Sequence, residues 1–291
     1  MSRQVIIMKT CTLNNGVEMP LLGFGTYQTA GDECARSVET ALQCGYRLID
    51  TATLYENEDQ VGEAIRKSGV NRQEIFLVTK ISFKDYEHTV DSVAASLKKL
   101  GTDYLDLVLL HWPFANYYKA WQDLEKLYQV GVIRAIGVSN FNPDRLVDLI
   151  SYNKVVPAVN QIETHLYCQR QEHHKWEDQY GVAHMAYAPL GQQRAKEMFT
   201  EPAVAALAAK YHKSPAQIAL RYLIQNDVIV IPKSTHAERI RENFALFDFA
   251  LTPEEMESLR ALDKNHPMIG TPDDPNKVLH SCKTWVAHFS E

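Results

Sequence analysis

The feature that most constrains the fold is the regular alternation of short apolar runs with longer amphipathic segments. The runs lack the apolar–polar alternation of half-exposed strands. This favours strands that are buried on both faces, paired in parallel and covered by helices. Seven runs are clear, and an earlier one is weakened by its glycines. In chain order they are Leu21–Gly25, Tyr46–Asp50, Ile75–Lys80, Tyr104–His111, Ile133–Val138, Ala158–Gln161, Val182–Tyr187 and Val228–Pro232.

The segments between the runs have the spacing of helices. They are Glu33–Gln43, Thr89–Leu100, Ala120–Val130, Pro143–Ile150, Glu172–Tyr180, Pro215–Gln225 and Ala237–Phe247. Asp32 is the expected N-cap of the first of these helices. An extra C-terminal helix, Pro253–Leu262, is predicted with Thr252 as its cap and Pro253 at its first position. Eight strand–helix units that close on themselves predict an α/β fold, a (β/α)8 TIM barrel. An open, doubly wound sheet is the competing fold.

Two short segments, Met8–Thr12 and Val17–Pro20, flank Asn14-Asn15-Gly16, which is a hairpin signal. We place this N-terminal β-hairpin outside the barrel, before its first strand. The 291 residues suffice for one barrel, which needs about 250. Because no linker, charge run or low-complexity stretch interrupts the chain, we expect residues 1–291 to form a single domain.

The composition excludes some classes of function. A net charge of −6 argues against nucleic acid as a partner, since phosphate backbones need a basic face. The five cysteines form no CxxC pair, which suits reduced thiols. The apolar run Val5–Met8 is too short for a secretory signal, and no stretch approaches the roughly 18 apolar residues of a membrane span. We therefore expect a cytoplasmic protein with no membrane partner, acting as a monomer.

Polar residues end three of the apolar runs: Asp50, Lys80 and His111. In a barrel these strand ends converge on one mouth, where active sites lie. Each residue alone has an ordinary structural explanation, as a cap, a lysine that reaches water, or a buried histidine with its hydrogen bonds satisfied. Because three strand ends agree, we interpret them as a catalytic site.

Tyr55 lies five residues beyond Asp50, in the following loop. An ammonium about 4 Å from a phenol is worth roughly 4 kcal/mol, or about three pKa units, at an effective dielectric constant of 20. We therefore predict that Lys80 lowers the pKa of Tyr55, an effect that Asp50 trims. The phenol could then protonate an oxyanion formed by hydride addition while His111 hydrogen-bonds the carbonyl oxygen. Such a set has no electron source of its own and needs a cofactor.

Local motifs give mixed signals about that cofactor. Gly23-Phe24-Gly25 is not a dinucleotide fingerprint, because Gln28 occupies the third glycine position. Lys233-Ser234 directly follows the last run and precedes a helix that carries Arg239, the usual place for a phosphate site in barrels. Adjacent His173 and His174 face different directions on a helix, so we predict a solvated surface there and no metal site.

The chain resembles the aldo-keto reductase family nearly from end to end, and is most similar to its bacterial 2,5-diketo-gluconate reductase-type members. The matching motifs are Leu22-Gly23-Phe24-Gly25-Thr26-Tyr27, Gly45-Tyr46-Arg47-Leu48-Ile49-Asp50-Thr51-Ala52 with Tyr55, Asn57-Glu58 and Gly62, Leu77-Val78-Thr79-Lys80, Asp103-Tyr104-Leu105-Asp106-Leu107 running to His111-Trp112-Pro113, Ile136-Gly137-Val138-Ser139-Asn140-Phe141, Asn160-Gln161-Ile162-Glu163, Tyr187-Ala188-Pro189-Leu190-Gly191, and Ile231-Pro232-Lys233-Ser234 with Arg239 and Glu242-Asn243.

The resemblance implies NADPH-dependent reduction of aldehydes and ketones, with NADPH/NADP+ as cofactor and no metal. It implies a catalytic tetrad with Tyr55 as the proton donor. The tetrad residues are Asp50, Tyr55, Lys80 and His111. The implied contacts of the nicotinamide end are Ser139, Asn140, Gln161 and Tyr187. Those of the adenosine end are Lys233, Ser234, Arg239 and Asn243, and Glu242 is implied as a cofactor contact as well. Further implied cofactor contacts are Gly25, Thr26, Tyr27, Asp50 and Leu190.

The sequence departs from the family where the substrate binds. Relatives often carry tryptophan two residues past Lys80, whereas this chain has Ser82, so one pocket wall should be open unless Phe114 or Tyr117 fills the space. The segments after Trp112, Gly191 and Pro267 are short. We expect a wide, shallow mouth lined by Tyr27, Ser82, His111 and Trp112, and broad activity on small aldehydes, α-dicarbonyls and keto-sugars.

Two other hypotheses remain open from the sequence. One is a Schiff-base enzyme with Lys80 as nucleophile, although Asp50 favours a charged lysine. The other is a catalytically weak NADPH-binding protein that retains the barrel, because a fold does not by itself fix a function.

Overall fold

The structure, a computed structural model, describes residues 9–269 and 272–285. Its centre is a sheet of eight parallel strands in chain order. These are β3 (Phe24–Gly25), β4 (Leu48–Asp50), β5 (Phe76–Ile81), β6 (Leu107–Leu110), β7 (Ile136–Ser139), β8 (Val159–Glu163), β9 (Ala183–Tyr187) and β10 (Ile229–Val230). A parallel bridge between Leu22 and Val230 joins the two edges of the sheet. The predicted (β/α)8 barrel is confirmed, and the open sheet is excluded.

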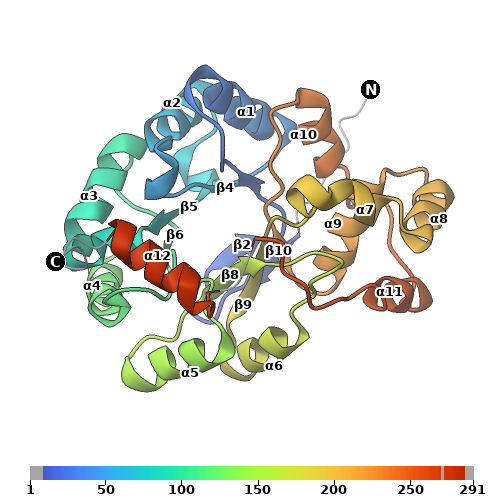
Figure 1. Ribbon diagram of the computed structural model, residues 1–291. Helices are drawn as coiled ribbons and strands as arrows, with labels where there is room; N and C mark the ends of the chain where they lie inside the picture. The colour runs from blue at the N-terminus through green and yellow to red at the C-terminus, as the bar shows by residue number, and fades with distance from the viewer. Residues whose placement is uncertain (1–8, 270–271, 286–291) are drawn as a thin grey trace.

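Each strand is followed by a helix that packs on the outside of the barrel (Figure 1). The helices are α1 (Gly31–Cys44), α2 (Glu58–Ser68), α3 (Thr89–Leu100), α4 (Tyr117–Gln129), α5 (Pro143–Tyr152), α6 (Gln171–Tyr180), α9 (Pro215–Gln225) and α10 (Ala237–Phe244). The strand residues are almost entirely buried, as their apolar runs predict.

The helix caps match the sequence analysis in one place and differ in another. Thr252 and Glu255 form a reciprocal capping box at the start of α11 (Pro253–Arg260), as the Thr-Pro start predicts. The prediction that Asp32 caps the first helix was wrong. The N-cap of α1 is Ala30, which makes no side-chain cap bond, and Asp32 lies in the first turn, where a carboxylate still complements the helix dipole.

Within the described ranges, four helices were not predicted from the sequence. They are α2, α7 (Ala195–Phe199), α8 (Pro202–Tyr211) and α12 (Pro275–Trp285). α8 consists largely of alanine, so its apolar face contrasts little with the rest of the helix. α12 lies in the tail after Pro267, which was expected to be short.

The predicted N-terminal hairpin consists of β1 (Thr10–Thr12) and β2 (Glu18–Pro20), paired antiparallel; Met8 lies outside the described residues. The side-chain amide of Asn14 donates to the carbonyl oxygen of Pro157 at 2.9 Å, and that of Asn15 donates to Arg134 at 2.9 Å. Both acceptors precede barrel strands, so the hairpin closes the N-terminal end of the barrel. In Figure 1 it lies behind the strands, whereas α12 lies in front. The opposite face, where the strands end, is left for a site.

None of the helices in the described ranges combines the length and the apolar character that a membrane crossing requires.

Candidate active site

The four predicted catalytic side chains come together at the C-terminal ends of β4, β5 and β6. Lys80 is fully buried, and its ammonium donates three hydrogen bonds. The acceptors are Asp50 Oδ1 at 2.5 Å, the carbonyl oxygen of Thr51 at 3.0 Å and the Tyr55 hydroxyl at 3.3 Å. The other carboxylate oxygen of Asp50 accepts from the Gln161 amide at 2.8 Å. These bonds fix the ammonium beneath the Tyr55 hydroxyl.

The prediction that Lys80 lowers the pKa of Tyr55 was wrong in direction. Burial raises this pKa well above its ordinary value, and the nearby charge of Asp50 raises it further. Burial also raises the pKa of Asp50 and lowers that of Lys80, while their contact opposes both shifts. The Lys80 ammonium lies 2.5 Å from the Asp50 carboxylate and 3.3 Å from the Tyr55 hydroxyl. The nearer carboxylate therefore offsets the positive charge that would favour a phenolate. Tyr55 therefore stays protonated at neutral pH, which is the form that a proton donor needs.

His111 faces the same space as Tyr55, with their ring centroids 5.8 Å apart. Burial lowers the pKa of His111 well below its ordinary range, so the ring is neutral. Its Nδ1 is buried and has no hydrogen-bond partner among the described residues. A proton on Nδ1 would leave a buried N–H unpaired, which proteins rarely tolerate. We therefore place the proton on Nε2, where it can be donated to an oxygen in the cleft.

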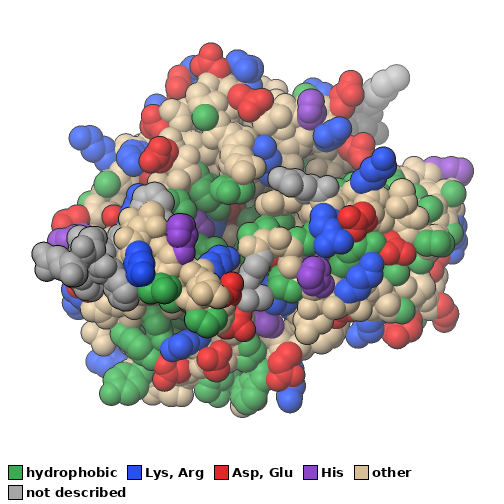
Figure 2. Space-filling model, viewed as in Figure 1, with side chains coloured by type: hydrophobic (Ala, Val, Ile, Leu, Met, Phe, Trp, Pro, Cys, Tyr) green, Lys and Arg blue, Asp and Glu red, His purple; other side chains and the backbone are tan. Residues whose placement is uncertain are grey.

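A cleft of about 520 Å³ opens above these residues. Figure 2 shows this face of the molecule hollowed near its centre, with hydrophobic side chains around the hollow. The predicted site residues that line the cleft are Gly25, Tyr27, Asp50, Tyr55, His111, Trp112, Ser139, Asn140, Gln161, Tyr187, Leu190 and Lys233. Those outside the lining are Thr26, Lys80, Ser82, Ser234, Arg239, Glu242 and Asn243.

The residues assigned to the nicotinamide end form one hydrogen-bonded group. The Tyr187 hydroxyl donates to Asn140 Oδ1 at 2.8 Å, and the Asn140 amide donates to the carbonyl oxygen of His111 at 3.0 Å. Ser139 donates to the carbonyl oxygen of Gln161 at 2.8 Å. These bonds hold polar groups and one aromatic ring in fixed positions along one wall of the cleft.

The residues assigned to the adenosine end lie around the start of α10. Lys233 is exposed, and its ammonium donates to the carbonyl oxygen of Gln28 at 3.3 Å. α10 begins at Ala237 without a side-chain cap, and Arg239 is exposed in its first turn. Glu242 instead accepts a hydrogen bond from the Ser214 hydroxyl at the start of α9. Lys233 and Arg239 form no ion pair with any residue that the structure describes, and they face solvent beside the uncapped start of α10.

Ser82 does not line the cleft, so the expectation of an open wall at this position was wrong. Its side chain is only 1% exposed, and its backbone N–H donates to Thr53. Phe114 stacks on Trp112 with ring centroids 5.4 Å apart, and Phe83 meets Phe114 edge to face. Phe83 and Phe114 are buried and form an aromatic group against Trp112, outside the lining of the cleft. The alternative in which Phe114 or Tyr117 fills the space left at Ser82 stays a prediction.

The tail after Pro267 also closes part of the mouth that was expected to be open. The buried carboxylate of Glu163 accepts from the backbone N–H groups of Met268 at 2.6 Å and Ile269 at 3.0 Å. It also binds His165 at 3.1 Å. Ile269 lines the cleft, and α12 follows in the chain and crosses the face of the barrel (Figure 1).

Sequence reasoning missed several residues of the lining, namely Gln28, Leu54, Ala188, Pro189, Gln192, Ile231, Pro232 and Ile269. Three of these, Gln28, Ala188 and Gln192, have positive φ angles, as does Asn140. Such strained backbone gathers at functional sites, but only glycine signals it in a sequence. Ile269 has no local signal, because Glu163 holds it from 106 positions away.

The prediction of a solvated surface at His173 and His174 was also wrong. His173 binds Asn142, and the His174 ring stacks on His184 of β9 with centroids 4.0 Å apart. His174, Glu177 and His184 could each offer a metal ligand within a 4.8 Å span. However, both ring nitrogens of His184 are already engaged, Nδ1 with Glu177 and Nε2 with Thr164. Stacked rings also do not direct their nitrogens to one point, so this geometry is that of a hydrogen-bonded cluster.

Comparisons with known proteins agree with this geometry. Residues 21–264 match the model of the aldo/keto reductase family. Glyoxal reductase of Bacillus subtilis is 42% identical over 91% of this chain and 96% of its own length. Methylglyoxal reductase DkgA of Escherichia coli is 39% identical over 90% and 96%. A Bombyx mori aldo-keto reductase solved in complex with NADP superposes with a TM-score of 0.87 at 36% identity, over 92% of this chain and 97% of its own. This chain is therefore an oxidoreductase that belongs to the aldo/keto reductase family.

Proposed function

We propose that the protein reduces aldehydes and ketones to alcohols with NADPH, and that Tyr55 donates the proton. The observation that carries this proposal is the buried ammonium of Lys80, held between Asp50 and the Tyr55 hydroxyl at the floor of the cleft. A neutral His111 beside Tyr55 provides a second donor for the same oxygen.

The residues present fit a nicotinamide dinucleotide phosphate. One wall offers the amide and hydroxyl groups of Ser139, Asn140 and Gln161 beside the ring of Tyr187. Gly25 also lines the cleft, and a Cβ at this residue would lie 3.0 Å from the carbonyl oxygen of Ile231, so the two backbone segments approach each other closely here. At the far end, Lys233 and Arg239 suit a 2′-phosphate. Bound NADPH would supply the hydride that adds to the carbonyl carbon.

The chain's own residues then complete the reduction. Tyr55 and His111 hold the carbonyl oxygen by hydrogen bonds and polarise the carbonyl group. As the carbon accepts the hydride, the O–H bond of Tyr55 breaks and a new O–H bond forms on the substrate, giving the alcohol and NADP+. An alkoxide oxygen is far more basic than a phenolate, so Tyr55 can donate even with a raised pKa. The Lys80 ammonium, 3.3 Å away, stabilises the phenolate that remains.

We further propose small aldehydes, α-dicarbonyls and keto-sugars as substrates. The names of the two bacterial relatives, glyoxal reductase and methylglyoxal reductase, favour the α-dicarbonyls. One continuous core cluster runs from Leu13 to Leu259, which supports a single domain over residues 1–291. We also propose that the protein acts as a monomer in the cytoplasm.

The proposal is tested by NADPH oxidation, read optically, over a panel of methylglyoxal, aromatic aldehydes and keto-sugars. We expect turnover of several of them. Cofactor binding without turnover of any carbonyl compound would favour the alternative, a weak NADPH-binding protein.

Cofactor choice gives a second test. The wild type should bind NADPH more tightly than NADH, and Arg239→Ala should weaken NADPH binding about tenfold or more while NADH binding stays unchanged. Fluorescence titration measures both affinities. Arg241→Ala is the matched control, an exposed arginine two positions further along α10, and should alter neither. Equal affinity of the wild type for the two cofactors would contradict the assignment of the phosphate site.

A further inference from the structure

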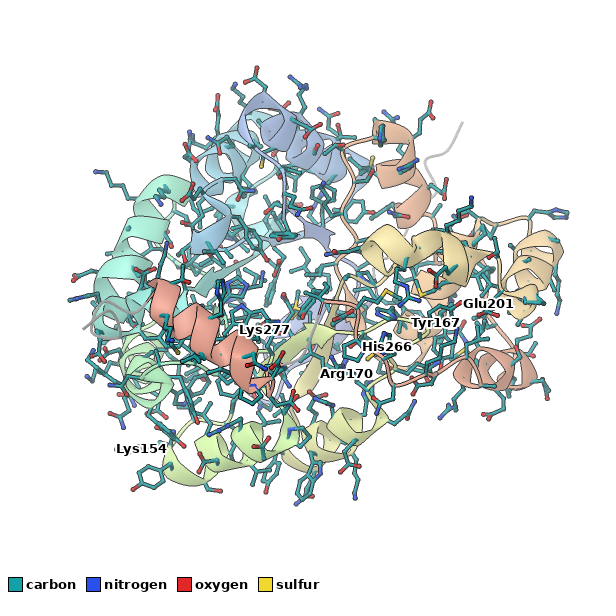
Figure 3. The ribbon with its side chains drawn as sticks, viewed as in Figure 1. Lys154, Tyr167, Arg170, Glu201, His266 and Lys277 are labelled. Carbon is teal, nitrogen blue, oxygen red and sulfur yellow. The ribbon has the colours of Figure 1, made fainter. Side chains whose placement is uncertain are left out.

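One lysine of the C-terminal helix reaches the wall of the cleft. The Lys277 ammonium lies 4.2 Å from the centroid of the Trp112 ring and 3.5 Å from the carbonyl oxygen of Ile269. Trp112 and Ile269 both line the cleft. Figure 3 shows Lys277 beside α12, on the side toward the centre of the barrel. Lys277 is not itself part of the lining, but its ammonium contacts two residues that are.

This ammonium has no carboxylate partner among the described residues. Glu163 and Asp274 influence its charge, but neither forms an ion pair with it. The Glu163 carboxylate already binds His165 and two backbone N–H groups of the tail. Burial outweighs both acidic neighbours and lowers the pKa of Lys277. A half-buried cation without a counter-ion is costly, and a bound anion would offset that cost.

The ring beneath Lys277 fixes its position relative to the reacting carbonyl. The Trp112 ring stacks with Phe114, at 5.4 Å between centroids, and with His111, at 6.4 Å. The Tyr86 hydroxyl also donates to the Trp112 carbonyl oxygen at 2.7 Å. The Trp112 ring thus contacts both the ammonium and the histidine that we propose holds the carbonyl oxygen. An anion bound there must be several atoms away from the carbonyl carbon.

We infer that Lys277 binds a carboxylate of the substrate, and that the preferred substrates are aldehydes or ketones with a carboxylate several atoms from the carbonyl. This inference rests on the proposed carbonyl reduction. It excludes 2-oxo acids as the preferred class, because their carboxylate is bonded directly to the reacting carbon and would stay beside Tyr55 and His111.

Two probes of nearly equal shape test the inference: 4-carboxybenzaldehyde and its neutral methyl ester. For the wild type we expect kcat/KM to be about tenfold or more higher for the carboxylate, the size of one charge-assisted hydrogen bond. Lys277→Met keeps the aliphatic stem and should abolish this preference, mainly through KM. Lys277→Arg should restore much of it. Lys283→Met is the control, an exposed lysine further along α12, and should keep the preference.

The outcomes separate this inference from the proposed function. Reduction of both aldehydes with equal kcat/KM in the wild type would overturn the role of Lys277 and leave carbonyl reduction intact. So would a preference that survives in Lys277→Met. Failure to reduce either aldehyde with NADPH would instead count against the proposed function. A rise in the KM for NADPH in Lys277→Met, equal for both aldehydes, would place the lysine at the cofactor and overturn the inference.

Discussion

Two buried acid–base pairs lie on either side of the barrel wall, and their difference explains why only one is suited to catalysis. The cleft pair, Asp50 and Lys80, lies at the floor of the candidate active site. The outer pair, Glu177 and His184, lies between α6 and β9. Each places a carboxylate oxygen 2.5 Å from a nitrogen, and both are almost fully buried.

The two pairs respond differently to burial because their bases differ in strength. In the outer pair burial raises the pKa of Glu177 to about 8 and lowers that of His184 to about 3, so the proton stays on the carboxyl and the pair is neutral. Lysine is a far stronger base than histidine, so the cleft pair retains a cation beside Tyr55. A buried charge is available for chemistry only where a strong base holds it and a cleft exposes it.

The largest effect expected is on the cleft side. Tyr55→Phe keeps the ring but removes the proton donor, so kcat should fall by at least about 10²-fold while the affinity for NADPH is kept. Steady-state kinetics and cofactor titration measure the two quantities. The control is Tyr222→Phe, which removes a buried hydroxyl that binds Gln169 outside the cleft and should leave kcat unchanged. Near-normal turnover by Tyr55→Phe would refute the assignment of the proton donor.

A smaller effect is expected from the outer pair. If Glu177 donates its proton to His184 Nδ1, then His184 Nε2–H must donate to the Thr164 hydroxyl, which lies 2.7 Å away. Thr164→Val leaves this buried N–H unpaired and should lower the free energy of unfolding by roughly 1–3 kcal/mol at pH 7. Urea denaturation measures the change. Thr164→Ser keeps the hydroxyl, so equal stability of the two variants would contradict this hydrogen-bonding scheme.

The smallest effect concerns the pH dependence of stability. Glu177 binds its proton more tightly when folded, because its pKa rises from 4.5 to about 8, so its contribution is present below pH 4.5 and is lost as the pH rises toward 8. His184 has its folded pKa lowered from 6.5 to about 3, so its effect opposes that of Glu177 up to pH 6.5. Between pH 6.5 and 7.5 the wild type should therefore lose about 1 kcal/mol.

Glu177→Gln imitates the protonated carboxyl and should remove this loss. Thermal unfolding of wild type and variant across the pH range tests it. Asp178→Asn, which changes an exposed neighbouring carboxyl, should keep the wild-type slope. If Glu177→Gln shows the same slope as the wild type, the outer pair is not neutral at pH 7.

The sequence predicted the barrel and the meeting of Asp50, Lys80 and His111 because strand ends carry positional information along the chain. It failed where the outcome depends on contacts between distant segments. Ser82 suggested an open wall of the cleft, but nothing local showed that this residue would be buried outside the lining. His173 and His174 appeared polar and exposed, since their packing against Asn142 and His184 is set by the barrel. The pKa of Tyr55 depended on degrees of burial that spacing alone does not reveal.

The attachment of the tail at Glu163 separates the position of the tail backbone from the identity of the tail side chains. Its carboxylate grips backbone N–H groups of residues 268 and 269, and every residue except proline offers such a group at those positions. Side chains in the tail can therefore be exchanged without loosening the anchor. Substitutions in the tail should therefore change the side chains that line the cleft without moving the tail backbone or the residues at the floor of the cleft.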